Sequence, residues 1–239
     1  LKQALIAAAQ AAGEPAAPAQ VEAAYQQLLR EREIRANLAA LQATGAKVEY
    51  HALDVADRSQ LEALIRDVTV RYGRIDGVIH GAGVIEDKLL RDKTPESFDR
   101  VFGVKVRSAG ALSELLDPDD LQFCVFFASI ASRYGNRGQA DYAAANEVLS
   151  KLALELDRRW PARVFSVAWG PWTEVGMVAE LQPHLKARGV AMITPEEGVQ
   201  RLLEELEYGW KGESEVLIAG GADRVIQPQA RNQTGAERP

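Results

Sequence analysis

Apolar positions along the chain recur in two ways, at helical spacing and in short uninterrupted runs. Helical spacing predicts helices over these segments: 1–12, 20–43, Arg58–Tyr72, Pro95–Leu116 and Gln139–Trp160. Another helix is expected to begin at Thr194-Pro195-Glu196-Glu197, because a hydroxyl side chain before proline and acids in the first turn are typical of a helix N-terminus. The apolar runs predict strands at Lys47–Val55, Gly77–His80, Gln122–Ser129, Arg163–Trp169 and Glu215–Ala219.

Strands and helices alternate after about residue 45, and the strands are apolar throughout rather than at every second position. Such strands indicate a parallel sheet that helices cover on both faces. The predicted fold class is therefore α/β with a doubly wound, Rossmann-like sheet, which binds ligands at the carboxyl ends of its strands. We expect three segments: N-terminal helices over 1–44, the Rossmann-like domain over 45–225 and a polar, disordered tail over 226–239.

The composition of the 239 residues is typical of a soluble globular protein, with 47% hydrophobic and 26% charged residues. The formal net charge of −6 does not indicate a surface for nucleic acid, and no apolar run reaches the roughly 20 residues of a membrane span. One cysteine, Cys124, excludes a disulfide framework, and three histidines far apart in sequence argue against a metal site. We therefore expect a cytoplasmic protein without metal, nucleic-acid or membrane partners.

The strongest chemical pattern links Ser129, Tyr142 and Asn146. Ser129 ends a predicted buried strand, a glycine-containing loop follows, and the next helix carries Tyr142 and Asn146 one turn apart on the same face. This layout can bring a hydroxyl and a phenol to one carbonyl oxygen. Reduction of a ketone needs such a pair, because the oxygen gains negative charge as hydride arrives and must then receive a proton.

Lys105 is the candidate that tunes the tyrosine. A free tyrosine titrates near pH 10, and a nearby ammonium favours the phenolate and lowers that pKa. A lysine on a helix is usually a solvated surface residue. The residues around Lys105 are mostly apolar or small (Val104, Val106 and Ala109), which favours an inward position.

Small residues and an acid follow two other strands. Gly81-Ala82-Gly83 comes directly after the strand Gly77–His80, where it forms either a tight turn or a place where a ligand approaches the backbone. Asp54, with Val55, ends the first predicted strand. Its carboxylate either accepts a hydrogen bond from an adenine amino group or caps the next turn.

Together these residues resemble the ketoreductase domains of iterative polyketide and polyunsaturated-fatty-acid synthases, within the short-chain dehydrogenase/reductase superfamily. The matching segments are Asp54-Val55, His80-Gly-Ala-Gly83, Lys105-Val106, Phe127-Ala-Ser129, Tyr142-Ala-Ala-Ala-Asn146 and Trp169-Gly-Pro-Trp172. Most of the superfamily carries lysine one helical turn after the tyrosine. Synthase ketoreductases carry asparagine there and lysine on the preceding helix, and this sequence is similar to them, with Asn146 and Lys105.

The resemblance implies a role for each matching residue. Tyr142 would donate the proton, Ser129 would hydrogen-bond the substrate carbonyl, Lys105 would tune Tyr142 and hold the nicotinamide ribose, and Asn146 would support Lys105 or a water relay. The implied cofactor is NADPH, and its binding residues would be Asp54, Val55, Gly81, Ala82, Gly83, Lys105, Tyr142, Gly170, Pro171 and Trp172. The implied reaction converts a 3-ketoacyl thioester on an acyl carrier protein into the 3-hydroxyacyl thioester, beside neighbouring synthase domains.

The resemblance also assigns Asp87, Tyr134 and Gln139 to the substrate side. The segment Ile85-Glu86-Asp87 aligns with a leucine-aspartate-aspartate motif that marks a 3R alcohol product in modular relatives. Glu86 replaces the first acid of that motif, and Arg137 replaces a proline common in the same class. We nevertheless take a 3R product as the hypothesis.

The resembling family begins with a strand, a glycine-rich loop and a second strand, yet no G-x-G-x-x-G pattern occurs in these residues. We therefore expect a truncated domain that lacks the first two strands of the sheet. The strand at Lys47 would then either pair with the strand at Gly77 or leave bare edges, and the chain alone would fold poorly and bind NADPH weakly.

Two other functions remain open at this point. A catalytically silent structural ketoreductase subdomain would explain the missing glycine-rich loop, although the presence of Tyr142, Ser129, Lys105 and Asn146 argues against it. A freestanding alcohol dehydrogenase of the same superfamily is disfavoured by the exchanged lysine and asparagine.

Overall fold

The computed structural model describes residues 1–11, 17–173 and 189–221, and the chain divides into two compact units, 1–52 and 53–239. The predicted disordered tail, 226–239, lies outside the described residues. The first unit contains α1 (Lys2–Ala11) and α2 (Pro18–Ala43). The Lys2 ammonium connects the two helices, because it lies 2.6 Å from the Glu22 carboxylate and 4.6 Å from the centre of the Tyr25 ring.

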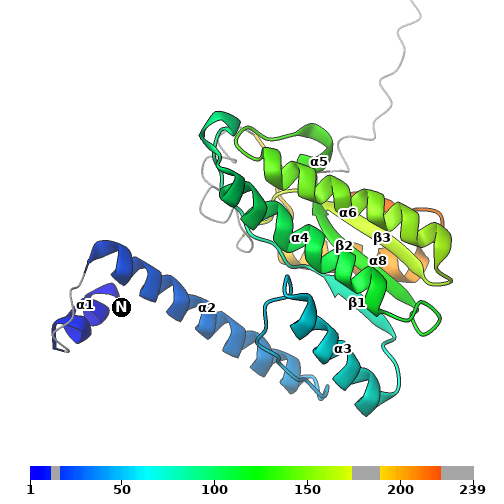
Figure 1. Cartoon of the computed structure of the whole chain (residues 1–239), viewed down its shortest axis with the longest axis horizontal. Helices are drawn as coiled ribbons and strands as arrows, with labels where there is room; N and C mark the ends of the chain where they lie inside the picture. Colours follow the sequence, from blue (N-terminus) through cyan, green and yellow to red (C-terminus); the bar gives the residue numbers. More distant parts are fainter. Residues whose placement is uncertain (12–16, 174–188, 222–239) are drawn as a thin grey trace, which may run out of the picture. The chain divides into compact units, whose positions relative to one another are not determined.

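A four-stranded parallel sheet forms the centre of the second unit (Figure 1). Its strands are β1 (Gly77–His80), β2 (Phe123–Ser129), β3 (Arg163–Trp169) and β4 (Glu215–Ile218), in the order β1-β2-β3-β4. Gly77 pairs with Phe123, Phe123 pairs with Arg163, and Ser166 pairs with Glu215. The four strands confirm four of the five predictions and the parallel α/β fold class.

Helices follow the strands with the predicted alternation. They are α3 (Arg58–Tyr72), η1 (Leu90–Asp92), α4 (Pro95–Leu115), α5 (Ala131–Tyr134), α6 (Ala140–Arg159) and α8 (Pro195–Tyr208). The Asp57 carboxylate caps α3, and the Thr94 hydroxyl caps α4. At α8, Thr194 and Glu197 form a capping box, which confirms the predicted start of this helix.

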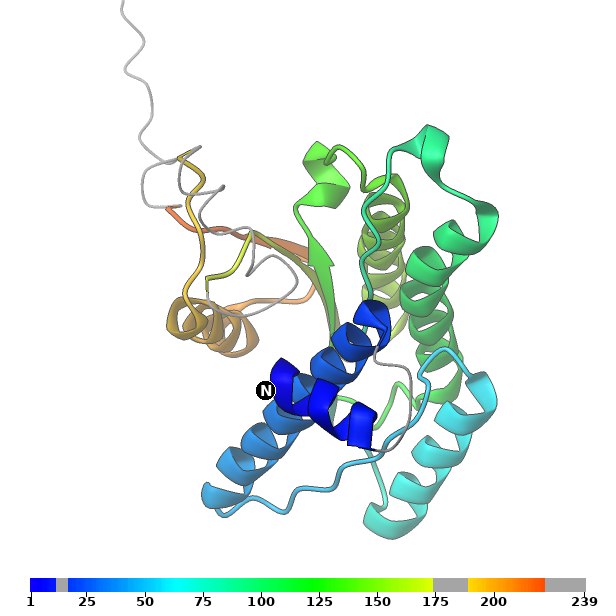
Figure 2. The ribbon, with the colours of Figure 1, turned by 90° about the vertical axis from the view of Figure 1, so that its left-hand side faces the viewer.

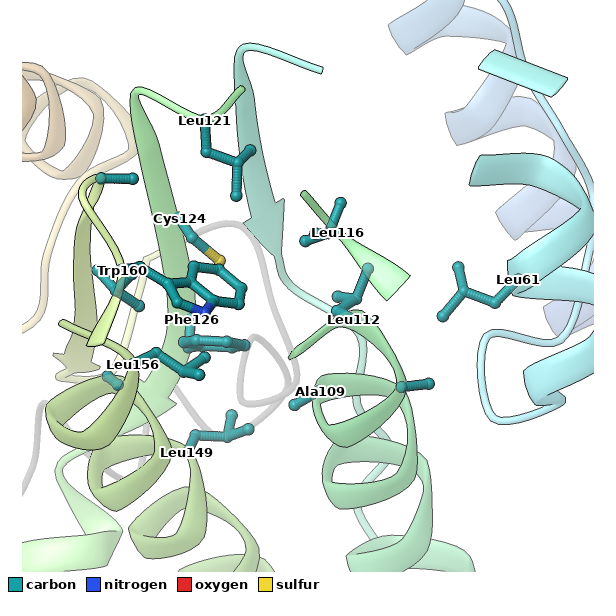
Figure 3. Close-up of a cluster of buried hydrophobic side chains, with 14 residues drawn as sticks. Leu61, Ala109, Leu112, Leu116, Leu121, Cys124, Phe126, Leu149, Leu156 and Trp160 are labelled. Atoms are coloured by element: carbon teal, nitrogen blue, oxygen red, sulfur yellow. The ribbon is translucent and has the colours of Figure 1, made fainter. Parts of the chain in front are cut away.

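Helices cover both faces of the sheet at β2 and β3 (Figure 2). On one face α4 and α6 pack on β2 and β3, and Figure 3 shows Cys124 and Phe126 of β2 among Ala109, Leu112, Leu149 and Leu156 of these helices. On the other face Val125, Phe165 and Val167 pack with Ile193 and with Leu202 and Leu206 of α8. Both faces of β2 and β3 are therefore buried, as their uninterrupted apolar sequences predict.

The predicted strand at Lys47–Val55 is wrong, because residues 46–54 contain no strand. A strand exists only through hydrogen bonds to a neighbour, and β1 pairs with β2 alone among the described strands. Of the two outcomes expected for this region, the structure has the bare edge, because the other side of β1 pairs with no described strand. Ile79 on this strand is 50% exposed. Within the described ranges, no helix is long and apolar enough to cross a membrane.

Candidate active site

Ser129 and Tyr142 meet at the carboxyl end of β2. Ser129 ends the strand, and its hydroxyl accepts a hydrogen bond from the Ala131 amide at 3.2 Å, at the start of α5. Gly135 and Gly138 then turn the chain with φ values of 67° and 89°, in the left-handed region that favours glycine. Tyr142 lies in the first turn of α6, and its side chain hydrogen-bonds with that of Ser129.

The surroundings of Tyr142 act on its pKa in opposite directions. Burial raises the pKa, and hydrogen bonds with Ser129 and Asn146 lower it. The Asp87 carboxylate adds a smaller effect that raises it. The net shift is upward, so the phenol is protonated at neutral pH and is able to donate a proton.

Lys105 lies inside the protein, as its apolar neighbours in sequence predict. The residue is 3% exposed, and its ammonium donates to the Phe127 carbonyl of β2 at 2.9 Å. Burial lowers its pKa to about 8. A Cβ atom on Gly83 would lie 2.8 Å from Lys105 Cε, so the glycine after β1 makes room for this side chain. An effect of Lys105 on the pKa of Tyr142 stays a prediction.

Asn146 lies one turn after Tyr142 and is fully buried. Its amide nitrogen donates to the Tyr142 carbonyl at 2.7 Å, while its Oδ1 atom has no hydrogen-bond partner among the described residues. A buried acceptor without a donor is rare in proteins. The Oδ1 atom is thus available to a donor such as an ammonium or a water molecule.

A cavity of about 260 Å³ lies beside β1 and α4. Its lining is mostly apolar and includes Val55, Val78, Ile79, Gly81 and Ala82. His80 and Ser108 also line it and share a buried hydrogen bond of 2.7 Å. Burial, with a smaller effect of the Lys105 charge, lowers the pKa of His80 to about 4, so this histidine is neutral.

Asp54 and the segment Gly170-Pro171-Trp172, both predicted to bind the cofactor, make different contacts within the protein. The Asp54 carboxylate accepts a hydrogen bond from the Ala56 amide at 2.9 Å, so it caps a turn, which is one of the two roles considered for it. Gly170-Pro171-Trp172 follows β3, and the Gly170 amide donates to the Ile218 carbonyl at 2.8 Å. The Trp172 ring lies 4.7 Å from that of Trp169, at the carboxyl ends of the strands.

The predicted substrate residues are only partly brought together. The Gln139 amide donates to the Asp87 carboxylate at 3.1 Å, which joins the loop after β1 to the start of α6. Tyr134 on α5 is 76% exposed.

Sequence reasoning missed the ion pair between Lys93 and Asp141, whose nitrogen and oxygen lie 2.7 Å apart in the same region. The segment LRDKTPE around Lys93 has the composition of a solvated loop, and only the position of Asp141 directly before Tyr142 was a signal.

The model of the KR domain family matches residues 19–174. The chain belongs to this family. KR domains of polyketide synthases are oxidoreductases of the short-chain dehydrogenase/reductase type, which reduce β-keto groups and use nicotinamide cofactors. Among the described residues, no group of three or more His, Cys, Asp or Glu side chains is placed to hold a metal ion.

Curated relatives of this KR domain are very large synthases. The chain is 34% identical over 192 residues to a polyunsaturated fatty acid synthase of Thraustochytrium sp., covering 80% of the chain and 7% of the relative. It is 41% identical over 170 residues to the phenolphthiocerol synthesis polyketide synthase type I Pks15/1 of Mycobacterium marinum, covering 69% of the chain and 8% of the relative. The chain thus spans less than a tenth of either relative.

Solved structures similar to this KR domain include ketoreductases of polyketide assembly lines. PlmKR1, from the first module of phoslactomycin biosynthesis in Streptomyces sp. HK803, has a TM-score of 0.70 and 33% identity over 77% of this chain and 42% of its own. A ketoreductase domain from the bacillaene assembly line has a TM-score of 0.70 and 30% identity over 81% of this chain and 48% of its own. The chain therefore corresponds to less than half of each of these solved chains.

Proposed function

We propose that this chain is the catalytic part of an NADPH-dependent ketoreductase that converts a 3-ketoacyl thioester on an acyl carrier protein into the 3-hydroxyacyl thioester. The observation that supports this most is that the Ser129 and Tyr142 side chains lie together at the carboxyl end of β2. The relatives are multidomain synthases, so the proposed partners are neighbouring synthase domains and the carrier protein.

The chemistry of the pair follows from its protonation. The Ser129 hydroxyl and the Tyr142 phenol would both hydrogen-bond the ketone oxygen, where negative charge develops. Tyr142 would then deliver its proton to that oxygen, because the phenol is held protonated at neutral pH. The Lys105 ammonium would stabilise the resulting phenolate, and it is suited to this role because it is buried and its described contacts include no carboxylate.

The residues present fit a nicotinamide cofactor at three places. Gly83 leaves room for the Lys105 ammonium beside β1, where this cation would hold the nicotinamide ribose. The apolar cavity lined by Val55, Gly81 and Ala82 would take the adenine end, and Gly170, Pro171 and Trp172 would bound the nicotinamide. When bound, NADPH supplies the hydride for the keto carbon.

The proposed product has the 3R configuration. The proposal rests on the alignment of Ile85-Glu86-Asp87 with the motif that marks this product in modular relatives, and the Gln139 side chain donates a hydrogen bond to Asp87. Chiral chromatography of the product checks the proposal, and a 3S alcohol would contradict it.

The test of the function is substrate-dependent oxidation of NADPH by the full-length protein. We expect the absorbance of NADPH to fall when a 3-ketoacyl thioester is added, faster with the carrier-bound thioester than with a free one, and slower with NADH in place of NADPH. Ser129→Ala should reduce the rate, since one donor to the ketone oxygen is lost. A folded protein without any thioester-dependent oxidation would indicate a silent structural subdomain instead.

A further inference from the structure

Lys93 and Asp141 form a buried ion pair near the candidate active site. The Lys93 ammonium lies 2.7 Å from the Asp141 carboxylate, and their side chains are only 3% and 1% exposed. Elsewhere in the described structure, each ion pair has at least one side chain more than a tenth exposed, such as Arg163 with Glu205 at 11% and 20%. Removing two charges from water is costly, and a hydrophobic pair is often equally stable. Stability alone is therefore a weak reason for this pair.

The pair joins three elements. Lys93 lies between η1 and α4, and its ammonium also donates to the Glu86 carbonyl at 2.8 Å, in the loop that follows β1. Asp141 lies in the first turn of α6, directly before Tyr142, and its second carboxylate oxygen accepts the Tyr142 amide at 2.9 Å. A shift of the ammonium would therefore reach both the loop and the backbone of the tyrosine.

Two more contacts hold the same loop, residues 84–93, against the chain that leads into α6. The backbone amide of Lys88 donates to the Gly138 carbonyl at 3.0 Å, and the side-chain amide of Gln139 donates to the Asp87 carboxylate at 3.1 Å. These two contacts are made by Asp87 and Lys88, which are exposed residues in the middle of loop 84–93, whereas the buried ion pair is made by Lys93, which ends the loop. The Gln139 side chain does not cap α6. Asp141 is the acidic residue in the first turn of this helix, where the helix dipole favours a negative charge.

We propose that the Lys93–Asp141 pair is a positioning device for the reduction: it sets the first turn of α6 so that the Tyr142 phenol meets Ser129, and it holds loop 84–93, with Asp87, beside them. The two residues do not touch the reacting atoms and act through Tyr142 and Asp87. This inference rests on the proposed function, and it adds two residues that the resemblance to ketoreductases does not supply.

The test separates positioning from stability in the full-length protein. Lys93→Met and Asp141→Asn each leave one buried charge unpaired, so both should lower stability and turnover. The double variant Lys93→Met with Asp141→Leu removes both charges, and its thermal stability should return close to that of the wild type. Its kcat should stay about 10- to 100-fold low with a nearly unchanged KM, because a small displacement of a catalytic group costs rate rather than binding. Lys93→Arg, which keeps the charge, should recover most of the rate.

A matched control is Asp99→Asn, which breaks the exposed Arg107–Asp99 pair of 2.9 Å on α4 and should change neither kcat nor stability. The second readout is the titration of Tyr142, followed by NMR of labelled tyrosine and assigned with Tyr142→Phe. The midpoint of the Tyr142 titration should move in the double variant. This readout does not depend on turnover, so it tests the positioning role even if the proposed ketoreductase function fails. A double variant with wild-type kcat, or with an unmoved Tyr142 titration where no turnover exists, would overturn the inference.

Discussion

The Cε atom of Lys105 lies 2.8 Å from the place where a Cβ atom on Gly83 would stand. The contact is with the far end of a flexible side chain, so an alanine at this position should displace the ammonium rather than prevent folding. Lys105 lies on α4, and its side chain passes Gly83 on the way to the end of β2. A side chain at position 83 would stand in its path.

Gly83→Ala should therefore move the Lys105 ammonium away from the Phe127 carbonyl and lower kcat by about 10- to 100-fold, with little change in stability. Steady-state kinetics of the full-length protein checks this. Gly110→Ala on α4 is the matched control, since nothing lies within 4 Å of its added Cβ atom. The control should keep its rate and gain up to about 1 kcal/mol of stability from helix propensity. Equal rates for Gly83→Ala and wild type would contradict the assigned position of Lys105.

We expect the protein to lose stability in acid because of the buried, neutral His80. Its pKa is about 4 in the folded state against 6.5 ordinarily, so the unfolded state binds more protons between these values. The free energy of unfolding should then fall as the pH drops from about 6.5 to 4, by roughly 3 kcal/mol in total. The pKa values of Asp57 and Glu86 are lowered to about 2 from 3.8 and 4.5, so these two groups reduce the stability mainly below about pH 4.5.

Pulse proteolysis in urea at pH 7 and pH 4.5 measures this dependence. His80→Gln keeps a polar group for Ser108 but does not titrate in this range, so its loss of stability between the two pH values should be smaller by about 2 kcal/mol or more. The same pH dependence in both proteins would show that His80 is not the responsible group.

We expect a larger side chain at Gly198 on α8 to overpack the core. A Cβ atom on this glycine would overlap the ring of Trp172, which is packed against Trp169 and against the buried cluster on this face of the sheet. Gly198→Ala should therefore lose about 1 to 3 kcal/mol of stability, measured by pulse proteolysis against Gly110→Ala. An unchanged stability would mean that the Trp172 ring does not pack on α8.

The bare edge of β1 predicts the behaviour of residues 1–239 by themselves. Unpaired strand edges with exposed apolar side chains associate, so this chain should self-associate, lack a cooperative melt and bind NADPH weakly. Ile79→Lys should increase the monomer fraction in sedimentation, because a charge on an edge strand opposes pairing. A monomeric chain with a cooperative melt and tight NADPH binding would contradict this account of the edge.

Much of the fold could be predicted because its signals are local. The strand β3 and the helix α3 begin and end where the apolar pattern predicts, since burial on both faces of a sheet and on one face of a helix requires those patterns. The strand at Lys47–Val55 could not be judged in this way, because a strand also depends on a neighbour that local sequence does not reveal. The short elements η1 and α5 are missed because they have too few residues for a period.

The candidate site divides along the same lines. Ser129, Tyr142 and Asn146 come from one continuous segment, so their spacing in sequence predicts their meeting in space. Lys105 was placed inward from its apolar neighbours, and its burial confirms this position. Lys93 and Asp141 are 48 residues apart in polar surroundings, and nothing in local sequence distinguishes such a buried pair from two solvated charges.

The central claim is that Tyr142 donates the proton in a ketone reduction. The most direct measurement compares thioester-dependent NADPH oxidation by the full-length wild type, Tyr142→Phe and the control Tyr208→Phe, whose tyrosine is 70% exposed on α8. We predict that Tyr142→Phe loses on the order of 10² to 10⁴ in rate while remaining folded, and that Tyr208→Phe keeps the wild-type rate. A Tyr142→Phe protein that reduces the thioester as fast as the wild type would contradict the account.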